Sequence, residues 1–98
     1  MTTRLLVLAS GNGSNLQAII DACETQVLQA QVIGVVSDNP NAYALHRAAQ
    51  HNIASKVVDP ANLNKHEFND QLASAVVEFH PDIVVLAGFM RLLTNNFL

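Results

Sequence analysis

Short apolar runs alternate along this chain with longer segments whose apolar residues recur with the period of an α-helix. The runs predict β-strands over residues 5–9, 32–36, 56–58 and 83–87. The first, second and fourth runs are continuously apolar, which is typical of strands buried on both faces of a sheet. The chain therefore has the strand spacing of a βαβαβαβ protein.

Three segments with helical periodicity lie between the strands. The first has one apolar stripe, formed by Leu16, Ile19, Ile20 and Cys23. The second, over residues 42–50, is rich in alanine and follows the turn-rich stretch SDNPN. The third has its apolar side chains on one face, namely Phe68, Leu72, Ala75, Val76 and Phe79. Asn64 precedes Glu67 by three residues, which predicts a capping box at the start of this third helix.

The alternation of elements predicts an α/β fold. We expect an open parallel sheet of Rossmann-like topology, with right-handed crossovers and strand order 3-2-1-4. The 98 residues are enough for one domain with a core, so residues 1–98 are interpreted as a single domain. In this strand order a crevice opens beyond the carboxyl ends of the first and fourth strands. The loops at residues 10–15 and 88–92 border that crevice.

The first of these loops reads SGNGSN and is the strongest candidate for a ligand site. Gly11 and Gly13 permit a tight turn and a close approach of the backbone to a ligand. Ser14 and Asn15 fall in the first turn of the following helix, where free N–H groups attract anions. A site for ATP would need the sequence GK[ST], and no lysine is nearby, so a phosphate monoester is the simplest ligand.

Two alternatives remain open for this loop. A dinucleotide fingerprint starting at Gly11 and Gly13 would need a third glycine where the chain has Leu16, so two of three positions match. Asp38 could then bind an adenosine ribose, as in an NAD(P)-dependent oxidoreductase, although a solvated turn residue is the favoured interpretation. The second alternative is a non-catalytic nucleotide-binding module.

Composition favours small molecules as partners. Five basic residues against eight acidic ones give a net charge of −3, without the basic excess of proteins that bind nucleic acids or anionic membranes.

A single cysteine and the lack of a signal peptide or membrane-length apolar run predict a cytoplasmic protein. No residues have metal-ligand spacing, so no metal is expected. Only 13% of residues are charged, which suggests that part of the surface is covered by something else.

The stretch SGNGSNLQAII, together with PDIVVLAGFMRLL around the fourth strand, closely resembles the phosphoribosylglycinamide formyltransferases, the folate-dependent enzymes of purine biosynthesis. The similarity runs through all 98 residues in the order of the elements. It implies transfer of a formyl group from the co-substrate 10-formyltetrahydrofolate to the amino group of glycinamide ribonucleotide. In the family, the ribonucleotide phosphate lies on the loop that matches Gly13, Ser14 and Asn15.

The resemblance also implies a folate site at the second loop. The family holds the pterin and formyl end, mostly through backbone groups, along the segment that matches Met90, Arg91, Leu92 and Leu93. From the residues themselves, apolar side chains around Arg91 suit a flat, partly polar ring, and an apolar cap with a solvated arginine is the alternative. Lys65 stands where the family has arginine beside the folate tail, and a solvated lysine is the alternative there.

The groups that catalyse the transfer in the family, an asparagine, a histidine and an aspartate, are expected beyond Leu98. The chain is therefore predicted to be a truncated N-terminal half that is inactive alone. His46, His51 and His80 are predicted at the edge of the sheet away from the crevice. His66 is predicted on the ligand edge but solvated. The apolar fourth strand, at an edge of the sheet, predicts self-association.

Overall fold

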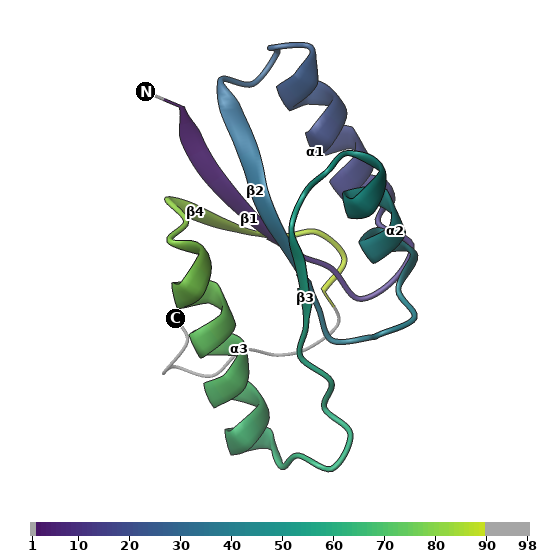
Figure 1. The fold of residues 1–98 in the computed structure, drawn as a ribbon, viewed down its shortest axis with the longest axis vertical. Helices are drawn as coiled ribbons and strands as arrows, with labels where there is room; N and C mark the ends of the chain where they lie inside the picture. The colour runs from purple at the N-terminus through teal and green to yellow at the C-terminus, as the bar shows by residue number, and fades with distance from the viewer. Residues whose placement is uncertain (1, 90–98) are drawn as a thin grey trace.

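The computed structural model describes residues 2–89 as an open sheet with helices on both faces (Figure 1). The elements in chain order are β1 (Thr3–Leu8), α1 (Ser14–Glu24), β2 (Ala30–Ser37), α2 (Tyr43–Gln50), β3 (Ser55–Val57), α3 (Lys65–Phe79) and β4 (Ile83–Leu86). The sheet is parallel and has the order β3-β2-β1-β4. The predicted α/β class, strand order and elements are confirmed.

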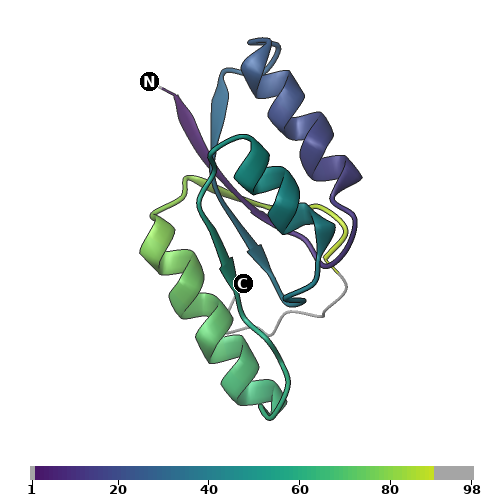
Figure 2. The ribbon, with the colours of Figure 1, turned by 45° about the vertical axis from the view of Figure 1, so that its right-hand side comes forward.

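Alternate residues of β1 contribute to two separate cores. Val7 packs with Leu16 of α1 and with alanines of α2 on one face of the sheet. Leu6 packs with Leu72 of α3 on the other face, and all four of these side chains are fully buried. Figure 2 shows α1 and α2 together and α3 apart from them. The prediction that the first two strands are buried on both faces is confirmed, because β1 and β2 lie inside the sheet.

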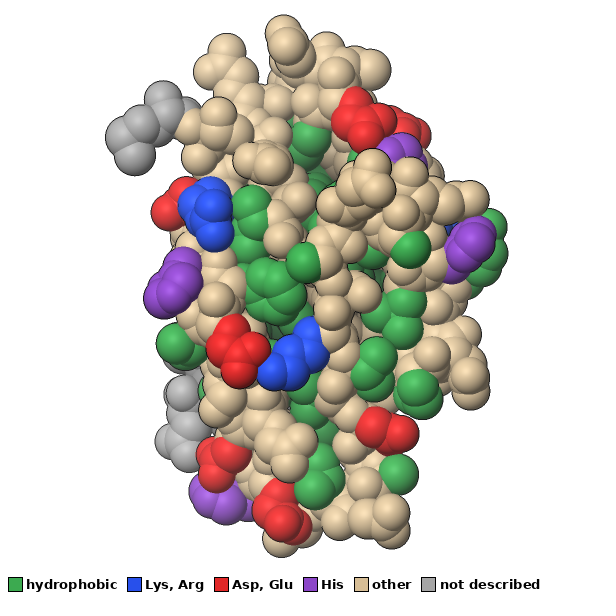
Figure 3. Space-filling view, viewed as in Figure 1, with side chains coloured by type: hydrophobic (Ala, Val, Ile, Leu, Met, Phe, Trp, Pro, Cys, Tyr) green, Lys and Arg blue, Asp and Glu red, His purple; other side chains and the backbone are tan. Residues whose placement is uncertain are grey.

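The fourth strand departs from the prediction of burial on both faces. Ile83 and Leu86 of β4 are 52% and 53% exposed. The reason is the place of β4 at the edge of the sheet, where among residues 2–89 it pairs with β1 alone. Figure 3 shows apolar side chains at the surface between scattered charged ones, on the face seen in Figure 1. A continuously apolar run therefore indicated a strand here without indicating its burial.

Hydrogen bonds close both ends of α3. At its start, the side chain of Asn64 accepts from the Glu67 N–H (2.8 Å) and the Glu67 carboxylate accepts from the Asn64 N–H (3.1 Å). The predicted capping box is thus confirmed. At its end, Arg4 donates from Nε to the carbonyl oxygen of His80 (3.1 Å) and from Nη2 to that of Phe79 (2.9 Å). Arg4 thereby ties β1 to the C-terminus of α3.

Candidate ligand-binding site at the carboxyl edge of the sheet

The loop between β1 and α1 depends on one glycine more than on the other. Gly13 is the N-cap of α1 and has a left-handed φ of 80°. A Cβ at Gly13 would lie 2.8 Å from both Cα and Cβ of Ala44 in α2, so a side chain does not fit there. A Cβ at Gly11 would meet no atom within 4 Å. Gly13 is therefore the residue that allows α2 to pack closely on the loop.

The first turn of α1 is open. Its first two residues, Ser14 and Asn15, are exposed, and no side chain caps the helix. The Gln17 N–H donates to the Gly13 carbonyl at 2.8 Å, so the N–H groups that precede it have no partner within the helix. This turn has no acidic residue. Because the N-terminus of a helix is also the positive end of its dipole, this arrangement can bind an anion.

Helix α2 holds the loop in place. The Ala44 N–H donates to the Gly11 carbonyl at 3.1 Å. Arg47 donates from Nε to the Asn12 carbonyl at 2.8 Å and from Nη2 to Asn12 Oδ1 at 2.7 Å. Two consecutive loop residues are thus bound to α2. The sequence analysis missed Arg47, because no local pattern connects a residue of the second helix with the loop before the first.

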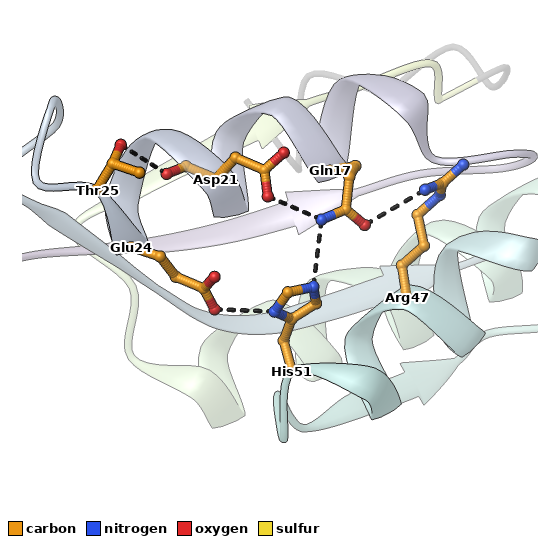
Figure 4. Close-up of polar contacts among 6 residues, drawn as sticks. All are labelled: Gln17, Asp21, Glu24, Thr25, Arg47 and His51. Atoms are coloured by element: carbon orange, nitrogen blue, oxygen red, sulfur yellow. Dashed lines mark hydrogen bonds and ion pairs between the residues drawn. The ribbon is translucent and has the colours of Figure 1, made fainter.

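Gln17 links Arg47 to a chain of polar side chains along α1 (Figure 4). Its Oε1 accepts from Arg47 Nη1 at 3.3 Å, and its Nε2 donates to Asp21 Oδ1 at 3.0 Å. The same Nε2 lies 3.2 Å from His51 Nε2, and His51 Nδ1 lies 2.8 Å from Glu24 Oε2. These contacts are mutually consistent when His51 carries its proton on Nδ1. The contacts of Gln17 orient its amide toward Arg47.

The loop after β4 lies beside the first loop, as the strand order predicts. The Ser10 N–H donates to the carbonyl of Gly88 at 3.3 Å. Gly88 has a φ of 74°, so the chain turns sharply as it leaves β4. The predicted folate residues of this loop lie outside the described residues, and these are Met90, Arg91, Leu92 and Leu93.

Asp38 is not the solvated turn residue that the sequence favoured, since it is only 9% exposed. Asp38 lies in the bend directly after β2: the Asn39 N–H donates to Ser37 Oγ at 3.1 Å, so this turn encloses Asp38, and the Asn41 N–H donates to Asn39 Oδ1 at 2.9 Å. Asp38 is therefore a buried turn residue that directly follows β2, a strand inside the sheet. The predicted turn in SDNPN is confirmed, and the prediction that Asp38 is solvated was wrong.

The remaining candidates lie on α3 and at its ends. Lys65 is the first residue of α3 and is exposed. The side chain of His66 is 75% exposed and lies 3.2 Å from Asp70 Oδ2, so its predicted solvation is confirmed. His80 is the C-cap of α3, just before β4 and away from the ligand edge, as predicted. Among residues 2–89, no three His, Cys, Asp or Glu side chains gather where they could hold a metal ion.

A hollow of about 540 Å³ lies at the opposite edge of the sheet. Its lining includes Arg4, Cys23, Gln31 and Asn52, but no residue of the loop at 10–15. Burial raises the pKa of the Cys23 thiol, and the neighbouring Glu24 carboxylate adds to the rise. Cys23 is thus a protonated thiol packed against the core, as its place in the apolar stripe predicts. The hollow is separate from the open turn of α1.

The fold and the site define a class of protein: an open parallel α/β domain with an uncapped helix start at the carboxyl edge of its sheet. Residues 3–98 match the formyl transferase family, and the chain belongs to that family. The resemblance based on the two loops is thereby confirmed. No helix among residues 2–89 is both long enough and apolar enough to cross a membrane.

Individual members of the family show the same relationship. The phosphoribosylglycinamide formyltransferase of Escherichia coli is 45% identical over 94 residues, a match that covers 95% of this chain and 44% of that protein. The human trifunctional purine biosynthetic protein adenosine-3 is 39% identical over 95 residues, 96% of this chain and 9% of that protein. The crystal structure of glycinamide ribonucleotide transformylase 1 from Symbiobacterium toebii has a TM-score of 0.92 at 37% identity, covering 98% of this chain and 46% of that one. The chain spans about half the length of the formyltransferases it matches.

Proposed function

We propose that this chain is the N-terminal half of a phosphoribosylglycinamide formyltransferase and supplies the site for the phosphate of glycinamide ribonucleotide. The whole enzyme transfers a formyl group from the co-substrate 10-formyltetrahydrofolate to the amino group of the ribonucleotide, in purine biosynthesis. The observation that carries the proposal is the open first turn of α1, in a chain 45% identical to the E. coli formyltransferase.

The phosphate binds at Gly13, Ser14 and Asn15. Their N–H groups lie in the uncapped start of α1, and the exposed side chains of Ser14 and Asn15 add a hydroxyl and an amide. A dinucleotide is disfavoured at this loop, because Leu16 is fully buried where the fingerprint needs a glycine for close packing of helix and strand. A nicotinamide-dependent oxidoreductase therefore remains only as an alternative, which a binding measurement with NAD and NADP can test.

The folate lies along the loop after β4. The bond between the Ser10 N–H and the Gly88 carbonyl joins this loop to the phosphate loop, which supports a common edge of the sheet for the two substrates. The edge of a pterin ring alternates donors and acceptors, which suits main-chain groups. We place its contacts on the backbone of residues 90–93 and the folate tail near Lys65.

The chemistry of the transfer needs groups that residues 2–89 do not bring to this edge. The amine attacks the formyl carbon through a tetrahedral oxyanion, which needs a donor for the oxygen and a group that moves protons. His66 is exposed and paired with Asp70, and lies on a different helix from the phosphate site. We place the catalytic groups in the half of the relatives that this chain does not span. The 98 residues alone therefore bind ribonucleotide without turnover.

Calorimetry on the chain tests the proposal. We expect saturable binding of glycinamide ribonucleotide that inorganic phosphate competes away, and no binding of NAD or NADP. Absence of ribonucleotide binding contradicts the proposed function. Binding of a nicotinamide dinucleotide with displacement by inorganic phosphate would favour the oxidoreductase alternative, and binding of many nucleotides without preference would favour a non-catalytic module.

We also propose that the chain self-associates through β4. Ile83 and Leu86 are about half exposed, and apolar edge strands pair readily with other chains. Leu86→Lys places a charge on that edge and should shift the chain toward monomer. Light scattering at several concentrations measures the shift, and a wild-type chain that stays monomeric at high concentration contradicts the proposal.

We place the protein in the cytoplasm. Support comes from the biosynthetic relatives and from Cys23, the single cysteine of the sequence, which is a free thiol. Small secreted domains commonly rely on disulfides. Fluorescent tagging in cells tests this placement.

A further inference from the structure

We propose that Arg47 is a positioning residue for the phosphate site, fixing the loop at Asn12 so that the N–H groups at Gly13, Ser14 and Asn15 stay oriented toward the phosphate. The inference rests on the proposed function, since it concerns the same site. Arg47 itself lies on α2, outside the loop and outside the helix that binds the phosphate.

The guanidinium binds one residue with two parallel donors. Nε donates to the main-chain carbonyl of Asn12 at 2.8 Å, and Nη2 donates to Oδ1 of its side chain at 2.7 Å. A planar fork that holds both the backbone and the side chain of Asn12 fixes that residue in position and orientation. Asn12 stands between Gly11 and Gly13, the two residues whose backbones are least restricted. The fork therefore restrains the part of the loop that the glycines leave free.

Arg47 is itself held on several sides. Its Nη1 donates to Gln17 Oε1 at 3.3 Å, and its guanidinium carbon lies 4.8 Å from the centre of the Tyr43 ring. Its Cδ lies 3.3 Å from where a Cβ of Gly13 would stand, so its stem packs against the N-cap of α1. An arginine fixed in this way loses little further freedom when the ligand binds.

The contact with Arg47 also decides how Asn12 presents its amide. Because Oδ1 accepts from Arg47, the two donors on Nδ2 face away from the guanidinium.

Among residues 2–89, Arg47 forms no ion pair, and its partners Asn12, Gln17 and Tyr43 are neutral. Within this part of the chain, no carboxylate contacts the guanidinium and offsets its positive charge. That charge lies beside a loop that contains no lysine.

The test compares two arginines that make the same kind of contact. Arg4 also donates from Nε and Nη2, to the carbonyls of His80 and Phe79, but at the opposite edge of the sheet. Calorimetry with glycinamide ribonucleotide is run well below the unfolding temperature of every variant. We expect Arg47→Met to raise the Kd about tenfold or more, whereas Arg4→Met leaves the Kd unchanged although it lowers stability. Arg47→Lys should restore only part of the affinity, because an ammonium cannot form the fork.

A second measurement needs no ligand. Amide hydrogen exchange at Ala44, whose N–H donates to the Gly11 carbonyl of the loop, should be faster in Arg47→Met than in wild type, and unchanged in Arg4→Met. Affinity in Arg47→Met within about twofold of wild type overturns the inference, as does full rescue by lysine, which would make the role one of charge alone. If the wild-type chain does not bind the ribonucleotide, the proposed function fails, and the exchange rates still decide whether Arg47 positions the loop.

Discussion

Two helices of this protein follow strands of the parallel sheet and begin at its carboxyl edge in opposite ways. At the start of α3, Asn64 and Glu67 satisfy each other's N–H groups. At the start of α1, Gly13 offers no side chain, and the first turn has no acidic residue. A side-chain cap contributes about 1 kcal/mol to stability. Helix α3 has that contribution within its own sequence, and α1 lacks it.

The difference separates a helix start that serves the fold from one that is available to a ligand. At the capped start, the Glu67 N–H is already bonded and the Glu67 carboxylate already supplies a negative charge, so an external anion gains less there. At an uncapped start, a bound phosphate takes the place of the missing cap and adds its binding energy to the stability of the folded chain.

Ser14→Asp should have the largest effect. It places a negative charge in the open first turn of α1, where it repels the phosphate and acts as an internal substitute for it. We expect affinity for glycinamide ribonucleotide to fall at least about a hundredfold, while thermal stability without ligand rises slightly. Ser14→Asn, a neutral control, should retain most of the affinity in calorimetry. Unchanged affinity in the aspartate variant would move the phosphate site elsewhere.

Gly13→Ala should destabilise the chain by about 1–3 kcal/mol, because alanine tolerates the left-handed backbone poorly and its Cβ would overlap Ala44. Urea unfolding measures the change. Gly11→Ala is the matched control, since a Cβ there meets nothing within 4 Å, and its stability should stay close to that of wild type. Equal losses in the two variants would show that contact with α2 does not shape the loop.

Asn64→Ala should lower the free energy of unfolding by about 1 kcal/mol, because it removes the cap of α3. Affinity for the ribonucleotide should not change, since α3 packs on the other face of the sheet. Asn64→Asp keeps an acceptor for the Glu67 N–H and should retain most of the stability. Loss of ribonucleotide affinity in the alanine variant would contradict the separation of the two helix starts.

Lys65→Glu should have the smallest effect. A cation in the first turn of a helix opposes the helix dipole, so its replacement by an anion is expected to raise stability by about 0.5 kcal/mol. Chemical denaturation measures the gain, and Lys65→Gln should give about half of it. A loss of stability instead would mean that Lys65 makes a stabilising contact within the folded chain.

The features that the sequence predicted are those set by near neighbours or by a repeating pattern. The capping box needs only Asn64 and Glu67, three residues apart, and the apolar stripe of α1 follows from helical spacing. The strand order follows from the alternation of strands and helices, which leaves few ways to wind a parallel sheet. The loop at 10–15 was found because its glycines and its place before a helix form one local pattern.

The features that the sequence did not predict depend on what packs against a residue from elsewhere in the chain. Arg47 reaches Asn12 across 35 residues of sequence, and nothing near either residue indicates the contact. Asp38 lies in a turn-like stretch but is buried because β2 is inside the sheet. Ile83 and Leu86 belong to an apolar run but are half exposed because β4 is at an edge.

The central place of β1 has a consequence for the order in which the chain folds during its synthesis. β1 is made first, and Leu5 aligns with Val32 of β2 on one side and with Ile83 of β4 on the other. At synthesis rates of about 5–20 residues per second, several seconds pass between the appearance of these two partners. During that interval the β1–β2 pair can form and be covered by α1, while Leu6 still awaits α3. We therefore expect the nascent chain to pass through a state in which one apolar face is largely covered and the other is uncovered. The risk of aggregation in that state depends on how long the interval lasts rather than on the stability of the finished fold.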